Sequence, residues 1–370
     1  MTSMNKTVTS EGVARSSLET WRGFAAAVLL RAGLPTEPAV AVARGLVEGD
    51  AYGHSTHGLA LLADYVEEID NGKMRTSGRP EVVADAGAAA TWDALRLPGV
   101  WSTMLAVDDA VRRATAHGIG AVALRRSHHI GCLAAYLEAP ARAGHLVVVF
   151  SSDPSDAHVA PYGATTPVLT PNPVAAGIPS EPDPIIIDVS TSITTAGMCA
   201  KARAAGNRRA GRWLIDSEGA PTDDPFALKR GGSILPIGGL DHGHKGFGLS
   251  LLVEALTQGL AGYGRADKPT DWGAGVLVLA FAPSRFAGSD AFIRQTAWTG
   301  AAALAAPPID KARPVRLPGQ LALERKRRAE ADGLALEPAI IASLAALGRR
   351  FDVNLPIPAD GETRPHSTQS

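Results

Sequence analysis

The histidines of this chain are unevenly placed. Six of the ten occur in three close sets: His54 with His57, His128 with His129, and His242 with His244. An imidazole titrates near pH ~6.5 when unperturbed, so it can give or take a proton at neutral pH. Residues 50–58 are polar and contain two glycines, and the apolar spacing of residues 59–69 predicts a helix directly after them. We therefore expect His57 near a helix start, where it could serve as a general acid or base.

Other candidate side chains follow predicted strands. Three short apolar runs are each followed by such a residue: residues 121–124 by His129, residues 146–150 by Asp153, and residues 185–187 by Asp188. If these strands run parallel, their carboxyl ends lie along one edge of the sheet, where α/β proteins place their ligands. The pattern predicts convergence on one cleft. The alternative is that polar residues follow strands simply because loops are polar.

Three chemistries could use this set of residues. A histidine beside a hydride carrier could protonate a ketone oxygen or deprotonate an alcohol. Alternatively, His54, His57, His129 and Asp153 could ligate zinc in a metal-dependent hydrolase or lyase, although no HExxH helix supports that hypothesis. In the third interpretation the histidines satisfy buried backbone carbonyls. We favour proton transfer and predict no metal site.

The phosphate-binding signals differ in quality. Residues 118–123 fit the string G-x-G-x-x-A, but a predicted helix precedes them and a strand follows, which reverses the order that a dinucleotide fingerprint needs. Gly118 is therefore predicted to end a helix. Residues 241–249 are a better candidate, because Lys245 and several glycines lie in a predicted loop just before an apolar helix. This segment could hold a phosphate.

Composition limits the function classes. The 36 basic and 37 acidic residues give a net charge of −1, so no overall field favours nucleic-acid binding. Two cysteines in 370 residues suit a reducing compartment. No apolar run approaches the ~18 residues of a membrane span, and the N-terminus lacks the apolar region of a signal peptide. These features predict a cytoplasmic protein without membrane or nucleic-acid partners.

The apolar patterns predict an α/β fold with two domains. Helical patterns at residues 18–75 and 310–350 suggest one helical domain built from both ends of the chain. Between them, residues 76–309 alternate short strands with helices, which predicts an α/β domain for cofactor binding and catalysis. Residues 1–17 and 355–370 are polar and are predicted to be disordered tails.

Seven short motifs occur in register with those of a known family. They are residues 53–58 (GHSTHG) for G-H-x-S-H-G, 127–131 (SHHIG) for S-N-H-F-G, 160–163 (APYG) for A-P-W-G, 171–173 (PNP) for T-N-P, 188–192 (DVSTS) for D-M-A-T-S, 244–249 (HKGFGL) for Y-K-G-Y-G-L, and 316–320 (RLPGQ) for R-x-P-G-E. Over about residues 46–347 the chain thus resembles the malate/L-lactate dehydrogenase family, which includes ureidoglycolate and sulfolactate dehydrogenases and diketogulonate and piperideine-carboxylate reductases.

The resemblance implies an NAD- or NADP-dependent oxidoreductase on a non-Rossmann mixed sheet, with the cofactor between subunits of a homodimer or higher oligomer. It implies catalytic roles for His57, His129 and Asp188, with His57 as proton donor and acceptor. The positions implied for cofactor contact are Asp188, Ser190, Thr191, Ser192, Lys245, Gly246, Gly319 and Gln320. Those implied for substrate contact are Thr56, Tyr65, Asp153 and Asn172.

One departure from the family pattern concerns the substrate. Members that bind a 2-oxo or 2-hydroxy carboxylate usually carry Arg four positions after the histidine of S-H-G, and this chain has Leu61 there. Either Arg125 or Arg126 substitutes, or the substrate is less acidic or differently placed. We expect hydride transfer between NAD(P)H and a small 2-oxo or 2-hydroxy acid. A cyclic imino acid is the alternative substrate, and a catalytically silent member remains open.

Overall fold

The computed structural model describes residues 15–208 and 211–356. The tail predictions for residues 1–14 and 357–370 lie outside the described residues. The prediction was wrong for the inner ends of both tails. Arg15 and Ser16 form strand β1, Ser17 caps the first helix with its side chain, and Leu355 packs against the main core.

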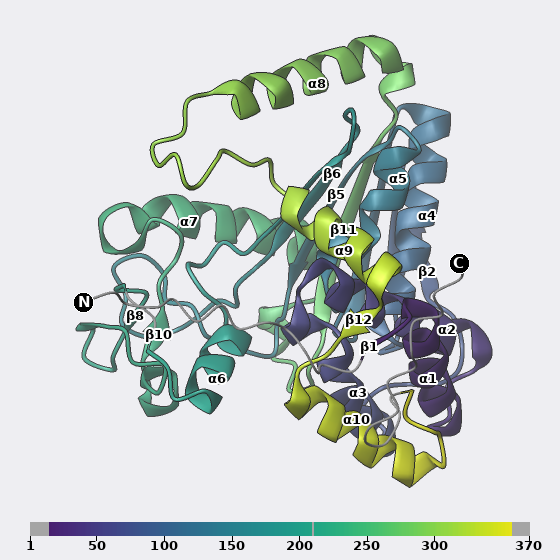
Figure 1. The fold of residues 1–370 in the computed structure, drawn as a ribbon, viewed down its shortest axis with the longest axis vertical. Helices are drawn as coiled ribbons and strands as arrows, with labels where there is room; N and C mark the ends of the chain where they lie inside the picture. The colour runs from purple at the N-terminus through teal and green to yellow at the C-terminus, as the bar shows by residue number, and fades with distance from the viewer. Residues whose placement is uncertain (1–14, 209–210, 357–370) are drawn as a thin grey trace, which may run out of the picture.

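A seven-stranded sheet forms the centre of the molecule (Figure 1). Its spatial order is β2 (Glu81–Asp85), β3 (Ala89–Asp93), β4 (Ile119–Ser127), β11 (Ala274–Phe281), β5 (Leu146–Ser152), β6 (Val174–Ile178) and β7 (Ile185–Val189). Only β3 and β4 pair in parallel. Because β11 separates β4 from β5, and β6 separates β5 from β7, the strands β4, β5 and β7 all run in one direction. Their carboxyl ends therefore meet at one edge although none of them are neighbours.

Helices cover both faces of this sheet. Helix α4 (Gly99–His117) packs on β4 and β11. Helix α7 (Gly239–Glu254) and the π-helical turn after it cover the other face. Alternate side chains of β11 serve the two layers, with Val276 and Val278 in the main core and Leu277 in a separate cluster on the α7 side. The nearly continuous apolar sequence of β11 follows from burial on both faces.

Helices from the N-terminal part and the C-terminal part of the described chain lie side by side next to the sheet (Figure 1). The elements there are α1 (Leu18–Arg31), α2 (Thr36–Tyr52), α3 (Leu62–Asp70), α9 (Gln320–Asp332) and α10 (Pro338–Phe351). Helix α10 contacts α1 and α3, α9 contacts α2, and β1 (Arg15–Ser16) pairs with β12 (Leu334–Ala335). The boundaries of the two domains stay a prediction.

Several smaller elements complete the fold. They are α5 (Glu138–Arg142), α6 (Ala196–Ala204), α8 (Ser289–Ala305), the three-stranded sheet of β8 (Leu214–Ile215), β9 (Pro221–Thr222) and β10 (Ser233–Ile234), and the 3₁₀ turns η1 (Ser55–His57), η2 (Leu59–Leu61) and η3 (Leu133–Tyr136). Helix α8 extends away from the sheet (Figure 1). Among the described helices, none is both long and apolar enough to cross a lipid bilayer.

The two glycine-containing segments, at residues 118–123 and 241–249, have different structures. Gly118 caps the end of α4 with φ +91°, and β4 follows, which confirms that it is not a phosphate loop. The loop predicted at residues 241–249 is wrong, because these residues belong to α7. A break in the helical backbone at His242 divides α7, so Lys245 still lies close to the start of the longer helical part.

Candidate active site

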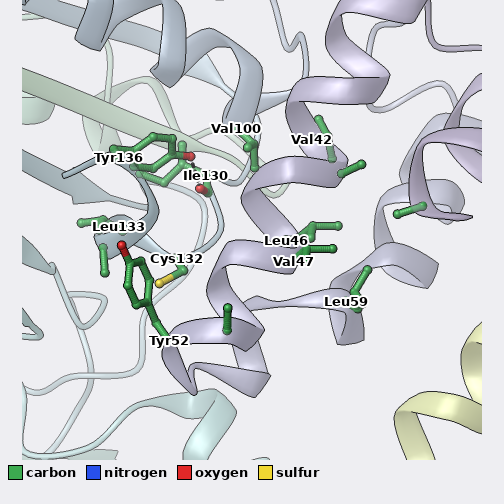
Figure 2. Close-up of a cluster of buried hydrophobic side chains, with 14 of the residues drawn as sticks. Val42, Leu46, Val47, Tyr52, Leu59, Val100, Ile130, Cys132, Leu133 and Tyr136 are labelled. Atoms are coloured by element: carbon green, nitrogen blue, oxygen red, sulfur yellow. Dashed lines mark hydrogen bonds between the residues drawn. The ribbon is translucent and has the colours of Figure 1, made fainter. Parts of the chain in front are cut away.

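A cluster of buried apolar side chains holds the segments that carry the candidate site together. Helix α2 contributes Leu46 and Val47, the turn η2 contributes Leu59, and the segment after β4 contributes Ile130 and Leu133 (Figure 2). These side chains are 5% exposed or less. His57 lies two residues before Leu59, and His129 lies directly before Ile130. The packing of these apolar neighbours therefore fixes the positions of the two histidines.

Seven of the fourteen predicted site residues line one pocket of about 540 Å³. Its wall includes His57, His129, Asp153 and Asp188, so the convergence predicted from the strand ends is confirmed. The reason is the strand direction described above. Asp188 is the second-last residue of β7, and Asp153 directly follows β5. A pocket of this size suits a small ligand together with part of a cofactor.

The turn that carries His57 is anchored from α2. A carboxylate oxygen of Asp50 accepts a hydrogen bond of 2.7 Å from the backbone N–H of Leu59. Gly58 lies against that carboxyl group, and a Cβ at this position would come within 2.3 Å of it. Burial raises the pKa of Asp50 to about 7, against the lowering effect of the Leu59 hydrogen bond. A glycine is therefore required directly after His57.

His57 is held in its neutral form at neutral pH. Its Nδ1 lies 2.9 Å from the hydroxyl oxygen of Thr56. Burial, reinforced by the neighbouring His54, lowers the pKa of His57 to about 4. Within the described part of the chain, Nε2 has no hydrogen-bond partner. That nitrogen is available to exchange a proton with a ligand in the pocket.

His129 is fixed more tightly than His57. The backbone N–H of Gly131 donates to its Nδ1 at 3.3 Å, so Nδ1 is an acceptor and the ring proton resides on Nε2. The hydroxyl of Tyr65 lies 2.9 Å from the same Nδ1. The ring stacks on Trp272, with centroids 4.6 Å apart, and lies 5.8 Å from the ring of His57. Burial and then the charges of the neighbouring histidines lower the pKa of His129 well below its ordinary value.

Asp188 is a desolvated carboxyl group at the end of β7. One of its oxygens accepts a hydrogen bond of 3.0 Å from the backbone N–H of Ala134, and the thiol of Cys132 lies 3.8 Å from the same oxygen. Burial raises the pKa of Asp188, while His54 opposes the shift. The pKa values of His57 and His129 are thus lowered and that of Asp188 is raised, so each shift favours the uncharged form of the group. Such shifts are common at catalytic sites.

The remaining predicted pocket residues differ in what they offer. Thr56, Asp153 and Ser190 line the pocket, and burial raises the pKa of Asp153. Asn172 also lines it, but its amide is already engaged. The Asn172 Nδ2 donates to the Glu254 carboxylate at 2.9 Å and to a backbone carbonyl at 3.3 Å, while its Oδ1 accepts from a threonine. Its side chain braces the pocket wall.

Several predicted residues lie away from this pocket. Tyr65 is buried behind His129 and does not line the cavity. The hydroxyls of Thr191 and Ser192 are buried in bonds to backbone carbonyls, at 3.0 Å and 2.7 Å. Lys245 and Gly246 lie on α7, and Gly319 and Gln320 lie at the start of α9 beside β7. None of these residues lines the pocket of the single chain.

The neighbours of His129 include residues that the sequence did not reveal. Trp272 forms a wall of the pocket from the segment before β11, and no motif marks it. His128 was grouped with His129, but its ring is fully buried and its Nε2 lies 3.1 Å from a Glu68 carboxylate oxygen. Burial lowers the pKa of His128 to about 3. Consecutive residues of an extended segment point to opposite sides, so only one of this pair reaches the pocket.

Two sequence hypotheses can be corrected from these positions. Neither Arg125 nor Arg126 replaces the family arginine, because both bind the buried carboxylate of Asp93, with Nε–O distances of 2.8 Å and 2.9 Å, and neither lines the pocket. The residues proposed for zinc also do not form one ligand group. Among the described residues, the side chains close enough to share an ion are instead His54, Cys132 and Asp188, whose ligand atoms lie within 4.8 Å of one another.

Comparison with known proteins agrees with the motifs. The profile of a family described as malate/L-lactate dehydrogenase matches residues 16–345. The chain is 33% identical to a (2R)-3-sulfolactate dehydrogenase (NADP(+)) of Chromohalobacter salexigens, covering 89% of this chain and 97% of the relative. It is 32% identical to a Delta(1)-pyrroline-2-carboxylate reductase of Ancylobacter novellus, covering 87% and 94%.

The fold agrees as well. The crystal structure of malate dehydrogenase from Entamoeba histolytica superposes with a TM-score of 0.88, covering 94% of this chain and 100% of that one, at 23% identity. The two proteins therefore share the same fold, including the mixed seven-stranded sheet. Together, the matched profile, the sequence relatives and the shared sheet show that this chain belongs to the malate/L-lactate dehydrogenase family of oxidoreductases.

Proposed function

We propose that this protein transfers a hydride between NAD(P)H and the keto carbon of a small 2-oxo acid or a derivative of one, with His57 as acid and base. The observation that carries the proposal is the pair of stacked, neutral imidazoles in a pocket that Asp188 also lines. When bound, a nicotinamide supplies or accepts the hydride. The protein then needs only to place the substrate and to handle one proton.

The residues of the pocket divide this work. His57 gives its proton from Nε2 to the carbonyl oxygen in reduction and takes it back in oxidation. His129 keeps a fixed N–H at Nε2, because its Nδ1 accepts from Gly131, and can donate a hydrogen bond to the same oxygen. Asp188, whose interactions are with Ala134, Cys132 and His54, orients the site or binds the cofactor. Trp272 shields the site from water on one side.

The cofactor fits this pocket in part. Ser190 and the first residues of α6 line the pocket; the Thr195 hydroxyl caps the N–H of Met198, and the positive end of the helix dipole favours the phosphate of a dinucleotide. The other proposed contacts, at Lys245 and Gln320, lie outside the pocket of a single chain. Helix α7 also exposes about half of Leu249, Leu251 and Leu252. We propose that a second copy covers this apolar face and that the dinucleotide lies between the two subunits.

A cyclic imine is the second candidate substrate. The relative named as a pyrroline-2-carboxylate reductase is 32% identical over most of the chain. Reduction of a C=N bond needs the same hydride and one proton, so the same residues could serve. The carboxyl groups of Asp153 and Asp188 in the pocket would favour a protonated imine.

The test of the proposed function is His57→Ala. A substrate is first found by screening oxo acids, their amides and cyclic imino acids with NADH and with NADPH, followed by nicotinamide absorbance. Removing general acid–base help should lower kcat by roughly 10²–10⁴-fold while cofactor affinity is retained. The control is His117→Ala, which removes an exposed histidine at the end of α4 and should leave turnover unchanged. Near-normal turnover of the His57 variant would exclude the role.

A further inference from the structure

The charged groups that line the pocket are all acids or histidines. Three carboxyl groups lie in its wall, from Asp153, Asp156 and Asp188. Among the described residues that line it, none is a lysine or an arginine. A carboxylate on the substrate would therefore enter a site that already holds acidic groups and that offers no fixed cation of the chain's own.

Three arginines near the pocket wall are engaged elsewhere. Arg125 and Arg126 bind Asp93, as described above. Arg265 approaches the pocket wall, but it donates to the Glu254 carboxylate at 3.0 Å and to backbone carbonyls, including that of Asp153 at 2.8 Å. Each guanidinium thus has a carboxylate partner within the protein, and freeing one would leave that partner unpaired.

The two stacked histidines, His57 and His129, do not supply the missing charge at neutral pH. His57 and His129 are desolvated, and their pKa values lie below the ordinary value for the reasons given above. The pocket is also lined by His54 and His158. The Nε2 of His158 lies 2.8 Å from a carboxylate oxygen of Asp156. His158 therefore has a carboxylate partner within the protein.

The wall near His57 is apolar instead. Leu61 lies four residues after His57, in η2, and reaches the pocket surface. Ile130, Leu133 and Met198 line the same cavity. A leucine at this position excludes water without offering a hydrogen bond, so it suits an uncharged group and disfavours an ionised one.

Building on the proposed function, we propose that the natural substrate carries no ionised carboxylate beside its reacting carbon, and is a neutral derivative such as a 2-oxo or 2-hydroxy amide. The neutral amide keeps a carbonyl and an N–H group for the polar atoms of the pocket. It avoids placing an unpaired anion next to Asp153 and Asp188. The proposal assigns Leu61 the role of selecting against charge.

The experiment compares lactamide with lactate, which have the same size and differ in the charge of one end. The wild-type protein is first saturated with NADH or NADPH, with which neither ligand can react, and each ligand is then titrated by calorimetry. We expect lactamide to bind about tenfold more tightly than lactate, because the acid has no cation to pair with. Leu61→Arg should shift the ratio of dissociation constants at least about tenfold toward lactate, and Leu61→Gln, which is polar but uncharged, should not.

The outcomes separate the two proposals. Tighter binding of lactate by the wild-type protein overturns the charge selectivity alone, because it means that the N-terminus of α6 or a second subunit supplies the positive potential. Binding of neither ligand to the cofactor complex overturns it as well. Failure of both NADH and NADPH to bind contradicts the proposed function itself. The wild-type comparison decides the matter even if the arginine variant does not fold.

Discussion

Two cavities of this molecule contain buried titratable groups, and the two sets of groups differ in how many charged partners they have. In the candidate active site, His57 and Asp188 are desolvated and have few charged partners. In the second cavity, between α2, α5 and α9, Glu138 accepts hydrogen bonds from Tyr52 at 2.6 Å, Lys326 at 2.7 Å and Arg142 at 2.8 Å. Burial raises the pKa of Glu138, but these donors outweigh it and lower the pKa to about 2.

Helix α2 shows the contrast within one turn. Glu48 contacts Lys326 and Arg22, and so belongs to the paired cluster. Asp50, two residues later, faces the active-site turn and has a pKa raised to about 7 by burial. Paired charges at the second cavity hold elements together, whereas groups at the first have few charged partners, and burial shifts their pKa values in the direction that favours the uncharged form. Burial alone does not distinguish them; the number of partners does.

The largest expected effect concerns pH. Reduction of a ketone consumes one proton, so the kcat/KM profiles of reduction and oxidation must differ by one power of proton concentration. With the pKa of His57 lowered to about 4, only a small and falling fraction is protonated above that pH. Reduction should therefore slow about tenfold per pH unit between about pH 5 and about pH 8, roughly 10³-fold in all, while oxidation stays flat.

The measurement is kcat/KM in both directions over that range, with the residual activity of a His57→Gln variant as the control. In the variant the slope of the reduction profile should disappear. A wild-type reduction profile that is flat, with the pH dependence carried by oxidation instead, would show that the proton donor has a pKa above the range and is not a desolvated imidazole.

Sequence patterns predicted which strand ends would converge on one pocket better than they predicted the sheet around it. The strands that lead to His129, Asp153 and Asp188 are apolar enough to be recognised, and short motifs placed His57. The sheet neighbours were not predicted, because β6 is a short segment rich in alanine and glycine whose place depends on long-range pairing. The common direction of the three strands was only a condition of the sequence argument, and the structure meets it, while the antiparallel strands between them were not predicted.

The sequence also could not predict which charged side chains pair with one another. Arg125 and Arg126 lie near the end of β4, which leads to the site, and nothing local shows that Asp93, on the neighbouring strand, binds both. Similarly, Tyr65 was assigned to the substrate, but in the structure its hydroxyl contacts His129 from behind. Whether a polar residue faces a ligand or another side chain depends on contacts between distant segments, which spacing does not encode.

The second prediction concerns the paired cluster. In Lys326→Met, Glu48 and Glu138 lose a buried partner, which should cost about 3 kcal/mol of unfolding free energy. The matched control is Lys201→Met, because Lys201 pairs with Glu337 at an exposed position, where the loss should stay below about 1 kcal/mol. Denaturant unfolding measures both values. Turnover at saturating substrate should change little in either variant, and equal losses of stability would contradict the distinction drawn between the two kinds of ion pair.

The smallest expected effect separates two buried tyrosines. Tyr65→Phe removes the hydroxyl that lies 2.9 Å from Nδ1 of His129, and one lost hydrogen bond of about 1 kcal/mol should lower kcat about five- to tenfold with cofactor affinity unchanged. Tyr52→Phe removes an equally buried hydroxyl that donates to Glu138, so it should lower stability and leave kcat unchanged. If Tyr65 acts by positioning His129, the loss from Tyr65→Phe should vanish in a His129→Ala background, because the interaction it supports is already gone. Additive losses in the double variant would mean that Tyr65 affects the site by another route.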